Sequence, residues 1–91
     1  MYKVVLSAGY RKALKRIVRN KDFNHLKLES VIHLLETGQK LDRKYRDHEL
    51  SGEFEGFREC HVQSDTLLVY QIYKNELVLL LIDIGSHSEL F

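Results

Sequence analysis

Three histidines in the second half of the chain, His48, His61 and His87, are the residues best suited to chemistry. An imidazole has an unperturbed pKa of about 6.5, so it can accept or donate a proton near neutral pH. Asp65 lies between two of these histidines in the sequence and could orient an imidazole or act as a base. His48 lies in a polar stretch and the other two lie near the ends of predicted strands. The three side chains can therefore converge at one edge of a sheet.

A zinc site is one alternative for these histidines, but zinc ligands often come in close pairs such as CxxC, HxH or HExxH. Here the three histidines are thirteen and twenty-six residues apart, and no local pair is present. Cys60 alternates away from His61 on a predicted strand, as a small core residue does. His25 and His33 lie in a predicted helix without a partner at metal-like spacing. The pattern therefore favours neither a metal site nor a cysteine nucleophile.

The remaining interpretation is proton transfer without a metal, and cleavage of RNA by its own 2′-hydroxyl is a reaction with these needs. It requires a base for the hydroxyl, an acid for the departing 5′-oxygen and a cation for the phosphate oxygens. Histidines can fill the first two roles, and an arginine can fill the third through its fork of N–H donors. Glu59 could hold an imidazole in the correct tautomer. Phe91 could stack on a base or attach the end of the chain to the core.

Length and composition indicate one small folded domain. The chain has 91 residues, of which 44% are hydrophobic and 30% charged, as in ordinary globular proteins. No apolar run approaches the roughly 18–20 residues that a membrane span needs, and the first residues lack a secretory signal pattern. The single cysteine cannot form an internal disulfide. These features predict a protein of the reducing cytoplasm that does not bind membranes.

The net charge of +1 conceals a strong segregation of charge along the chain. Residues 1–46 carry twelve of the fourteen Lys and Arg against four acids, a balance of +8, whereas residues 47–91 have a balance of −7. Such asymmetry favours a polyanionic partner for the first half. A basic helix face that only contacts solvent is the alternative.

The hydrophobic periodicity predicts a β-α-α-β-β-β order and a two-layer α+β fold, with a helical hairpin packed on a mainly antiparallel sheet. The predicted strands are Tyr2–Leu6, Phe57–Val62, Thr66–Tyr73 and Leu77–Ile84, the last two joined by a turn at Lys74 and Asn75. The first helix is predicted to be capped by Ser7 and to bury Tyr10, Leu14, Ile17 and Val18. The second is predicted to be capped by Asp22, to bury Leu28, Val31, Ile32 and Leu35, and to end at Gly38. Residues 39–56 are predicted to form a long loop and residues 86–91 a tail.

Four segments of the second half together resemble the YafQ branch of the RelE/ParE toxin superfamily. They read YRDHEL from residue 45, GEFEGFRECHV from 52, DTLLVY from 65 and GSHSELF from 85. The resemblance implies a single RelE-like toxin domain over residues 1–91. It also implies the toxin of a type II toxin–antitoxin pair, a cofactor-free and metal-independent endoribonuclease that cleaves mRNA on the ribosome. The implied partners are the ribosome with its mRNA and a DinJ-like antitoxin of the ribbon-helix-helix class.

Carried over residue by residue, the resemblance implies an active site of His48, Glu59, His61, Asp65, His87 and Phe91. His87 is then the general acid, Asp65 or His61 is the base or orients it, and Phe91 positions a nucleotide. Contacts to RNA phosphates are expected from Lys44, Arg46 and Arg58, and from Arg11, Lys12, Lys15, Arg16 and Arg19 of the first helix.

One departure from the family pattern concerns Asp83, which stands where family members often carry an arginine. A carboxylate cannot stabilise a phosphate oxyanion and would repel it. Alternation along the predicted strand places Asp83 on the face of Leu77, Leu79 and Leu81. We expect Arg58 or Arg46 to supply the missing cation. The alternatives are that the ribosome and its RNA do part of the work, or that the protein is weak or specialised.

Two other functions remain open alongside the ribonuclease. ParE-like relatives share the fold but inhibit DNA gyrase by binding, without catalysis. A degenerate toxin that acts only by binding would also explain Asp83. Clustered titratable groups favour the enzyme, because a binding surface does not need them.

Overall fold

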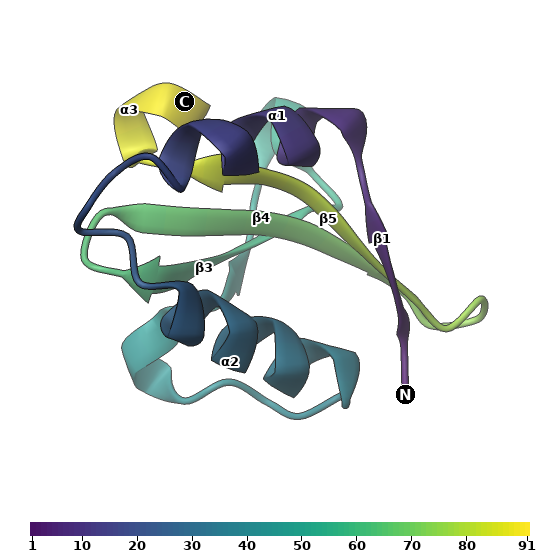
Figure 1. Cartoon of the computed structure of the whole chain (residues 1–91). Coiled ribbons are helices and arrows are strands. Elements are labelled where there is room, and N and C mark those ends of the chain that lie inside the picture. The colour runs from purple at the N-terminus through teal and green to yellow at the C-terminus, as the bar shows by residue number, and fades with distance from the viewer.

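The protein folds as a five-stranded mixed sheet with two main helices (Figure 1). The structure is a computed structural model that describes all residues from Met1 to Phe91. The elements follow in the order β1 (Lys3–Leu6), α1 (Ala8–Ile17), α2 (His25–Glu36), β2 (His48–Glu49), β3 (Arg58–Gln63), β4 (Thr66–Tyr73), β5 (Val78–Gly85) and α3 (His87–Leu90). Two short 3₁₀ turns, η1 (Arg43–Tyr45) and η2 (Gly52–Phe54), flank β2. The predicted α+β class is confirmed.

The strands lie in the order β1-β5-β4-β3-β2, with β1 parallel to β5 and every other pair antiparallel. The sheet is therefore mainly antiparallel, as predicted. The turn between β4 and β5 covers residues 74–77 rather than two residues. Leu77 adopts a left-handed conformation with φ of 54° and is 56% exposed, so β5 begins one residue later than predicted.

Helix α1 begins at the predicted cap. The Ser7 hydroxyl accepts a hydrogen bond from the Tyr10 backbone N–H at 3.0 Å and donates one to the Ile82 carbonyl of β5 at 2.8 Å. These bonds satisfy a free helix donor and hold the start of α1 on the sheet. Tyr10 and Ala13 are buried. Val18 is exposed because α1 ends at Ile17, so its predicted burial is wrong.

Helix α2 is capped by Asn24, not by the predicted Asp22. The Asn24 side chain accepts a hydrogen bond from the Lys27 backbone N–H at 3.1 Å. Gln63, at the end of β3, accepts from the Asn24 N–H at 2.8 Å and donates to the Asp22 carbonyl at 2.9 Å. The start of α2 is therefore tied to β3. Gly38, with φ of 76°, follows the helix end, as predicted.

One hydrophobic core lies between the sheet and the two helices. Figure 1 shows α1 and α2 running in opposite directions over different parts of the sheet, α1 against β5 and α2 toward β3. The side chains that share this core come from both helices and from β3, β4 and β5: Tyr10, Ala13, Leu28, Val31, Leu35, Cys60, Val62, Leu68, Tyr70, Leu79, Leu81 and Ile84, together with Phe23 and Leu41. No helix is long and apolar enough to cross a membrane.

Two predicted irregular segments contain short elements that position the site. The predicted loop 39–56 includes β2, which adds a fifth strand beside β3. The predicted tail is the short helix α3, whose start is a capping box. In it the Ser86 hydroxyl accepts from the Glu89 N–H at 3.3 Å, and the Glu89 carboxylate accepts from the Ser86 N–H at 2.8 Å. Both predictions were therefore incomplete.

Candidate active site

The sheet face that α1 and α2 do not cover carries three of the six predicted catalytic residues, His48, Glu59 and His61. Cys60 and Val62 of β3 point into the core, so strand alternation places Glu59 and His61 on the opposite face. His48 of β2 lies directly across from Glu59, and Leu67 of β4 lies across from His61. We call this surface the histidine face and define it by His48, Glu59, His61, Leu67, Val69 and Asp83.

Asp83 belongs to the histidine face because β5 contains a β-bulge. Leu81 pairs with Tyr70, and Asp83 pairs with Val69, so Ile82 is an extra residue on β5. Leu81 and Ile84 are both in the core, which requires Asp83 to point the other way. The predicted placement of Asp83 beside Leu79 and Leu81 is therefore wrong. Its carboxylate is half-buried and accepts a hydrogen bond from the Ile84 N–H at 2.8 Å.

His48 and Glu59 form a pair across β2 and β3. The His48 Nδ1 lies 2.7 Å from the Arg46 carbonyl, which can only accept, so Nδ1 carries a proton. In the neutral ring Nε2 is then free to accept a proton. It lies 3.7 Å from Glu59 Oε1. Protonation of Nε2 would place an imidazolium beside this carboxylate.

Glu59 is the one charged residue of the chain that is buried, with 5% of its surface exposed. Its Oε2 atom has no hydrogen-bond partner. Burial of an unpaired carboxylate is costly, and such groups often mark functional sites. The nearest ionisable side chain is that of His48, which is half exposed and carries a positive charge only when protonated. This arrangement suits a carboxylate that holds a protonated imidazole in place.

The pairing of β3, β4 and β5 brings the C-terminal residues to the same end of the sheet as His61. Gly85 lies across from Leu67, which lies across from His61, so α3 starts at the end of this row. Asp65, in the turn between β3 and β4, accepts from the His87 backbone N–H at 3.5 Å. Asp65 and His87 are exposed, and His61 is half-buried. The structure therefore brings His61, Asp65 and His87 to one end of the sheet.

Phe91 contacts two aromatic neighbours at the end of the chain. Its ring centroid lies 5.4 Å from that of His87 and 5.1 Å from that of Phe54 in η2, the latter in an edge-to-face arrangement. Phe91 is still 45% exposed, which leaves ring surface available for a base. The sequence did not single out Phe54; an isolated aromatic residue in a polar segment was the available signal.

Arg58 does not reach the histidine face. It lies across from Tyr70, a core residue, and therefore on the side of the sheet that the helices cover. Its guanidinium donates to both oxygens of Asp47, at 3.4 and 3.0 Å, and lies 3.3 Å from Glu49. The hydrogen bond that Arg58 donates to Asp47 raises the pKa of Arg58 above its ordinary value. The expectation that Arg58 supplies the catalytic cation is not supported by this position.

The same carboxylate of Asp47 also accepts a hydrogen bond from the hydroxyl of the buried Tyr70. Burial, followed by this bond, raises the pKa of Tyr70 above its ordinary range. Asp47 was not identified from the sequence, because only the fold brings it to residues eleven and twenty-three positions away.

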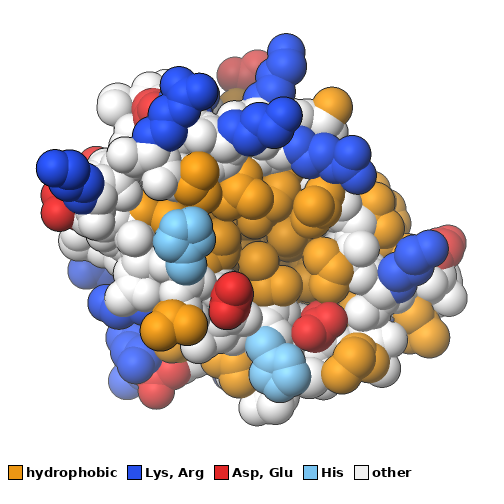
Figure 2. Space-filling model, in the orientation of Figure 1, with side chains coloured by type: hydrophobic (Ala, Val, Ile, Leu, Met, Phe, Trp, Pro, Cys, Tyr) orange, Lys and Arg blue, Asp and Glu red, His pale blue; other side chains and the backbone are white.

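The basic residues predicted to contact RNA are distributed over two surfaces. Figure 2 shows Lys and Arg side chains along the α1 edge of the molecule. Of the α1 residues, Arg16 forms an ion pair with Glu89 of α3 at 3.1 Å, and no ion pair engages Arg11, Lys12, Lys15 or Arg19. Hydrogen bonds from Ser86, with a smaller effect from Arg16, lower the pKa of Glu89. Lys44 and Arg46 lie in and beside η1, near His61, and both are exposed.

The other candidate groups take no part in the histidine face. Cys60 is fully buried, and burial raises its thiol pKa to about 12. His25 packs on Phe23, and His33 lies 3.4 Å from Glu36; both histidines are exposed on α2. No group of three or more His, Cys, Asp or Glu side chains is placed to hold a metal ion.

The comparison with protein families finds one family that matches almost the whole chain. The family described as "Bacterial toxin of type II toxin-antitoxin system, YafQ" matches residues 2–91. The fold and the match define the class of the chain, a bacterial toxin of a type II toxin–antitoxin system. Within that class, the chain belongs to the YafQ family.

Individual relatives agree with this assignment. The chain is 34% identical to the mRNA interferase toxin YafQ of Escherichia coli K12 over 73 residues, which is 80% of this chain and 76% of that protein. A Haemophilus influenzae protein that carries the YafQ name is 45% identical over 42 residues, so the matched segment spans 41% of that protein's length.

Solved structures match along the full length. The crystal structure of a metal-bound toxin from Helicobacter pylori has a TM-score of 0.91 and 47% identity, with 100% of both chains covered. YafQ in the crystal structure of the E. coli DinJ–YafQ complex has a TM-score of 0.84 and 26% identity, with 100% of this chain and 99% of that chain covered.

Proposed function

We propose that this toxin is an endoribonuclease that cleaves mRNA on the ribosome by attack of a 2′-hydroxyl, without using a metal. The observation that carries the proposal is the gathering of His48, Glu59 and His61 on one sheet face, with Asp65 and His87 at its end. Family membership and the mRNA interferase name of the E. coli relative support the same activity. Action on translated mRNA would place the protein in the cytoplasm.

In the proposed reaction the 2′-oxygen attacks the adjacent phosphorus while the bond from phosphorus to the 5′-oxygen breaks. A base takes the proton of the 2′-hydroxyl, and an acid gives a proton to the 5′-oxygen. We assign the acid to His87, whose exposed ring lies beside Phe91. We assign the base to His61, because Asp65 is already occupied by the His87 backbone. The products are a 2′,3′-cyclic phosphate and a 5′-hydroxyl.

Charge stabilisation at the phosphate falls to His48 and Arg46 in this proposal. Arg58 is held on the other side of the sheet, and Asp83 adds a negative charge to the histidine face. A protonated His48, held by the buried Glu59 carboxylate, supplies a positive charge on that face. Phe91 stacks on the nucleotide beside the cleaved bond.

The neutralising partner in this proposal is a DinJ-like antitoxin of the ribbon-helix-helix class. E. coli YafQ has been crystallised in a complex with DinJ. Figure 2 shows hydrophobic side chains at the surface between α1 and α2, with Lys and Arg along the α1 side and acidic and His side chains along the α2 side. The helices also carry apolar side chains that are only half-buried, Leu14, Ile17 and Ile32. An antitoxin segment with apolar residues against this surface and acidic residues facing α1 fits these features.

A toxin that acts by binding alone is a second candidate, favoured by one observation. Asp83 lies on the histidine face, where its charge opposes an approaching phosphate. A weak or inactive enzyme that still binds its target would tolerate this residue.

The test is cleavage of mRNA in a purified translation system with wild-type protein and the variants His87→Ala and Asp65→Ala. We expect His87→Ala to lose at least 100-fold in rate, in line with general acid catalysis. His33→Ala is the matched control, because His33 is exposed on α2 away from the histidine face. Undiminished cleavage by both site variants would refute the mechanism. Growth arrest with intact mRNA and damaged DNA would favour the binding-only function.

A further inference from the structure

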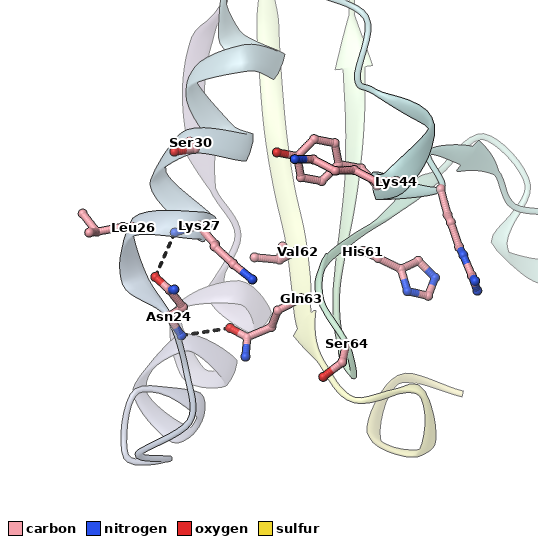
Figure 3. Close-up of a pocket in the computed structure, with 11 residues that line it drawn as sticks. Asn24, Leu26, Lys27, Ser30, Lys44, His61, Val62, Gln63 and Ser64 are labelled. Carbon is pink, nitrogen blue, oxygen red and sulfur yellow. Dashed lines mark hydrogen bonds between the residues drawn. The ribbon is translucent and has the colours of Figure 1, made fainter.

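A pocket of about 550 Å³ opens where the start of α2, η1 and the end of β3 meet (Figure 3). We call it the basic pocket and define it by Lys27, Lys44, Arg46, His61 and Gln63. Its volume lies within the range of small-molecule sites, roughly 300–1,000 Å³. Lys27 was not among the residues expected to contact RNA, and of the five residues that define the pocket the proposed reaction uses only Arg46 and His61.

The charge of the pocket is of one sign. Lys27, Lys44 and Arg46 line it, and no Asp or Glu is among its lining residues. None of the three cations forms an ion pair with a carboxylate elsewhere in the molecule. The Lys44 Nζ lies over the ring of Tyr45, 5.2 Å from the ring centroid. Three unneutralised cations around one concave surface are suited to an anion.

The walls of the pocket are fixed by hydrogen bonds. Gln63 bonds to the Asn24 backbone, and Asn24 in turn caps the Lys27 backbone N–H, as the dashed lines in Figure 3 show. In the same view the Lys27 side chain extends from α2 toward the end of β3. Lys27 is therefore placed by a local network rather than by a flexible loop.

Arg46 connects the pocket to the histidine face. Its side chain lines the pocket, whereas its carbonyl lies 2.7 Å from Nδ1 of His48. Its backbone is left-handed, with φ of 50°, which costs a non-glycine residue about 1–2 kcal/mol. His61 also belongs to both regions: it lines the pocket, and Figure 3 shows its ring on the side of β3 opposite to Lys27. The two surfaces therefore meet at the edge of β3.

We propose that the basic pocket binds the phosphodiester backbone of the mRNA strand one or two nucleotides from the bond that the histidine face cleaves. This inference rests on the proposed ribonuclease function, and it specifies where the mRNA next to the cleaved bond binds. Lys27 and Lys44 contact its phosphates, and Asn24, Ser30 and Ser64 offer polar groups to the sugars and phosphates. A positively charged groove that follows the backbone is the usual way of holding a single strand.

The test measures binding of a fully 2′-O-methylated trinucleotide, made as AAA and as UUU, which cannot be cleaved because it lacks a free 2′-hydroxyl. We expect the largest backbone amide shifts in NMR spectra at residues 24–27, 44–46 and 61–64. The double variant Lys27→Ala/Lys44→Ala should bind at least 10-fold more weakly at low salt. The slope of log K against log salt should fall by about 1.4, because each phosphate contact to a single strand contributes about 0.7.

The matched control removes the same charge elsewhere, at Lys3 of β1 and Lys74 of the β4–β5 turn, and should change affinity less than two-fold. Unchanged affinity of Lys27→Ala/Lys44→Ala, or amide shifts confined to other surfaces, would overturn the inference. Loss of mRNA cleavage by this variant with unchanged trinucleotide affinity would also overturn it, because the lysines would then contact the ribosome. Failure of the wild-type protein to cleave translated mRNA is measured separately and refutes the proposed function instead.

Discussion

Replacement of Arg58 or of its partner Asp47 tests whether Arg58 stabilises the fold rather than contacting the phosphate of the RNA. Arg58 donates two hydrogen bonds to Asp47, and the hydroxyl of Tyr70 donates to the same carboxylate. The side chains of Arg58 and Asp47 are 32% and 21% exposed, and Tyr70 is 1% exposed. We therefore expect Asp47→Ala to destabilise the fold and Arg58→Met to leave the chemistry intact.

The expected loss of folding free energy follows from the polar groups that each substitution leaves without a hydrogen-bond partner. In Asp47→Ala, the buried Tyr70 hydroxyl loses its acceptor, which costs about 1–3 kcal/mol. Arg58 loses its charged partner but keeps Glu49 and some water, so its loss is about 1–2 kcal/mol. A total of about 3 kcal/mol lowers the midpoint of thermal unfolding by roughly 12–24 °C for a domain of this size. Arg58→Met leaves Tyr70 bonded to Asp47 and should cost about 1–2 kcal/mol.

The assay combines thermal unfolding with single-turnover cleavage of ribosome-bound mRNA, at a temperature where each variant is folded. Arg43→Met is the control, because Arg43 is an exposed arginine of η1 without an ion pair. We expect Arg58→Met to cleave within about 3-fold of wild type. A loss of 100-fold or more in cleavage by Arg58→Met, with unchanged stability, would show that Arg58 acts on the phosphate and would refute the placement argued from the strand register.

Three further predictions concern the site and one turn. Glu59→Gln should lower the rate of cleavage at least 10-fold, because His48 loses its carboxylate partner. Urea unfolding should show no loss of stability, because Oε2 of Glu59 has no hydrogen-bond partner to lose. A loss of stability with full cleavage activity would contradict this prediction. Phe54→Ala removes the edge-to-face neighbour of Phe91, a contact of about 0.5–1.5 kcal/mol, and should lower kcat/KM of cleavage about 2- to 10-fold. Unchanged kcat/KM would show that Phe91 needs no such support. Leu77→Gly relieves a left-handed backbone and should stabilise the fold by about 0.5–1 kcal/mol in thermal unfolding, without altering cleavage. A lower unfolding midpoint would show that the Leu77 side chain matters more than its backbone strain.

The strand alternation in β3 was predictable from sequence, and it placed His61, Glu59 and Cys60 on their correct faces. The same rule failed for Asp83. A β-bulge at Ile82 shifts the alternation by one residue, and nothing in the apolar run of β5 reveals the extra residue. The consequence is chemical, because the shift moves a carboxylate from the core side to the histidine face.

Short elements were the other source of error. Strand β2 has two residues and α3 has four, too few to establish a period of 2 or 3.6. Pairing with β3 and the Ser86 capping box define them instead. The contact of Arg58 with Asp47 could not be predicted either, because it depends on the position of the segment before β2. Hence His48 and His87 were identified as candidates, but their partners became clear only in the fold.

The most direct measurement of the central proposal replaces one nucleotide of a ribosome-bound mRNA, the one 5′ to the cleaved bond, by its 2′-deoxy form. If the histidine face promotes attack by the 2′-hydroxyl, wild-type protein should leave this mRNA uncut and should cut the all-ribose mRNA to a 2′,3′-cyclic phosphate and a 5′-hydroxyl. Cleavage of the deoxy-substituted mRNA at the same bond, with a 5′-phosphate on the product, would contradict the account.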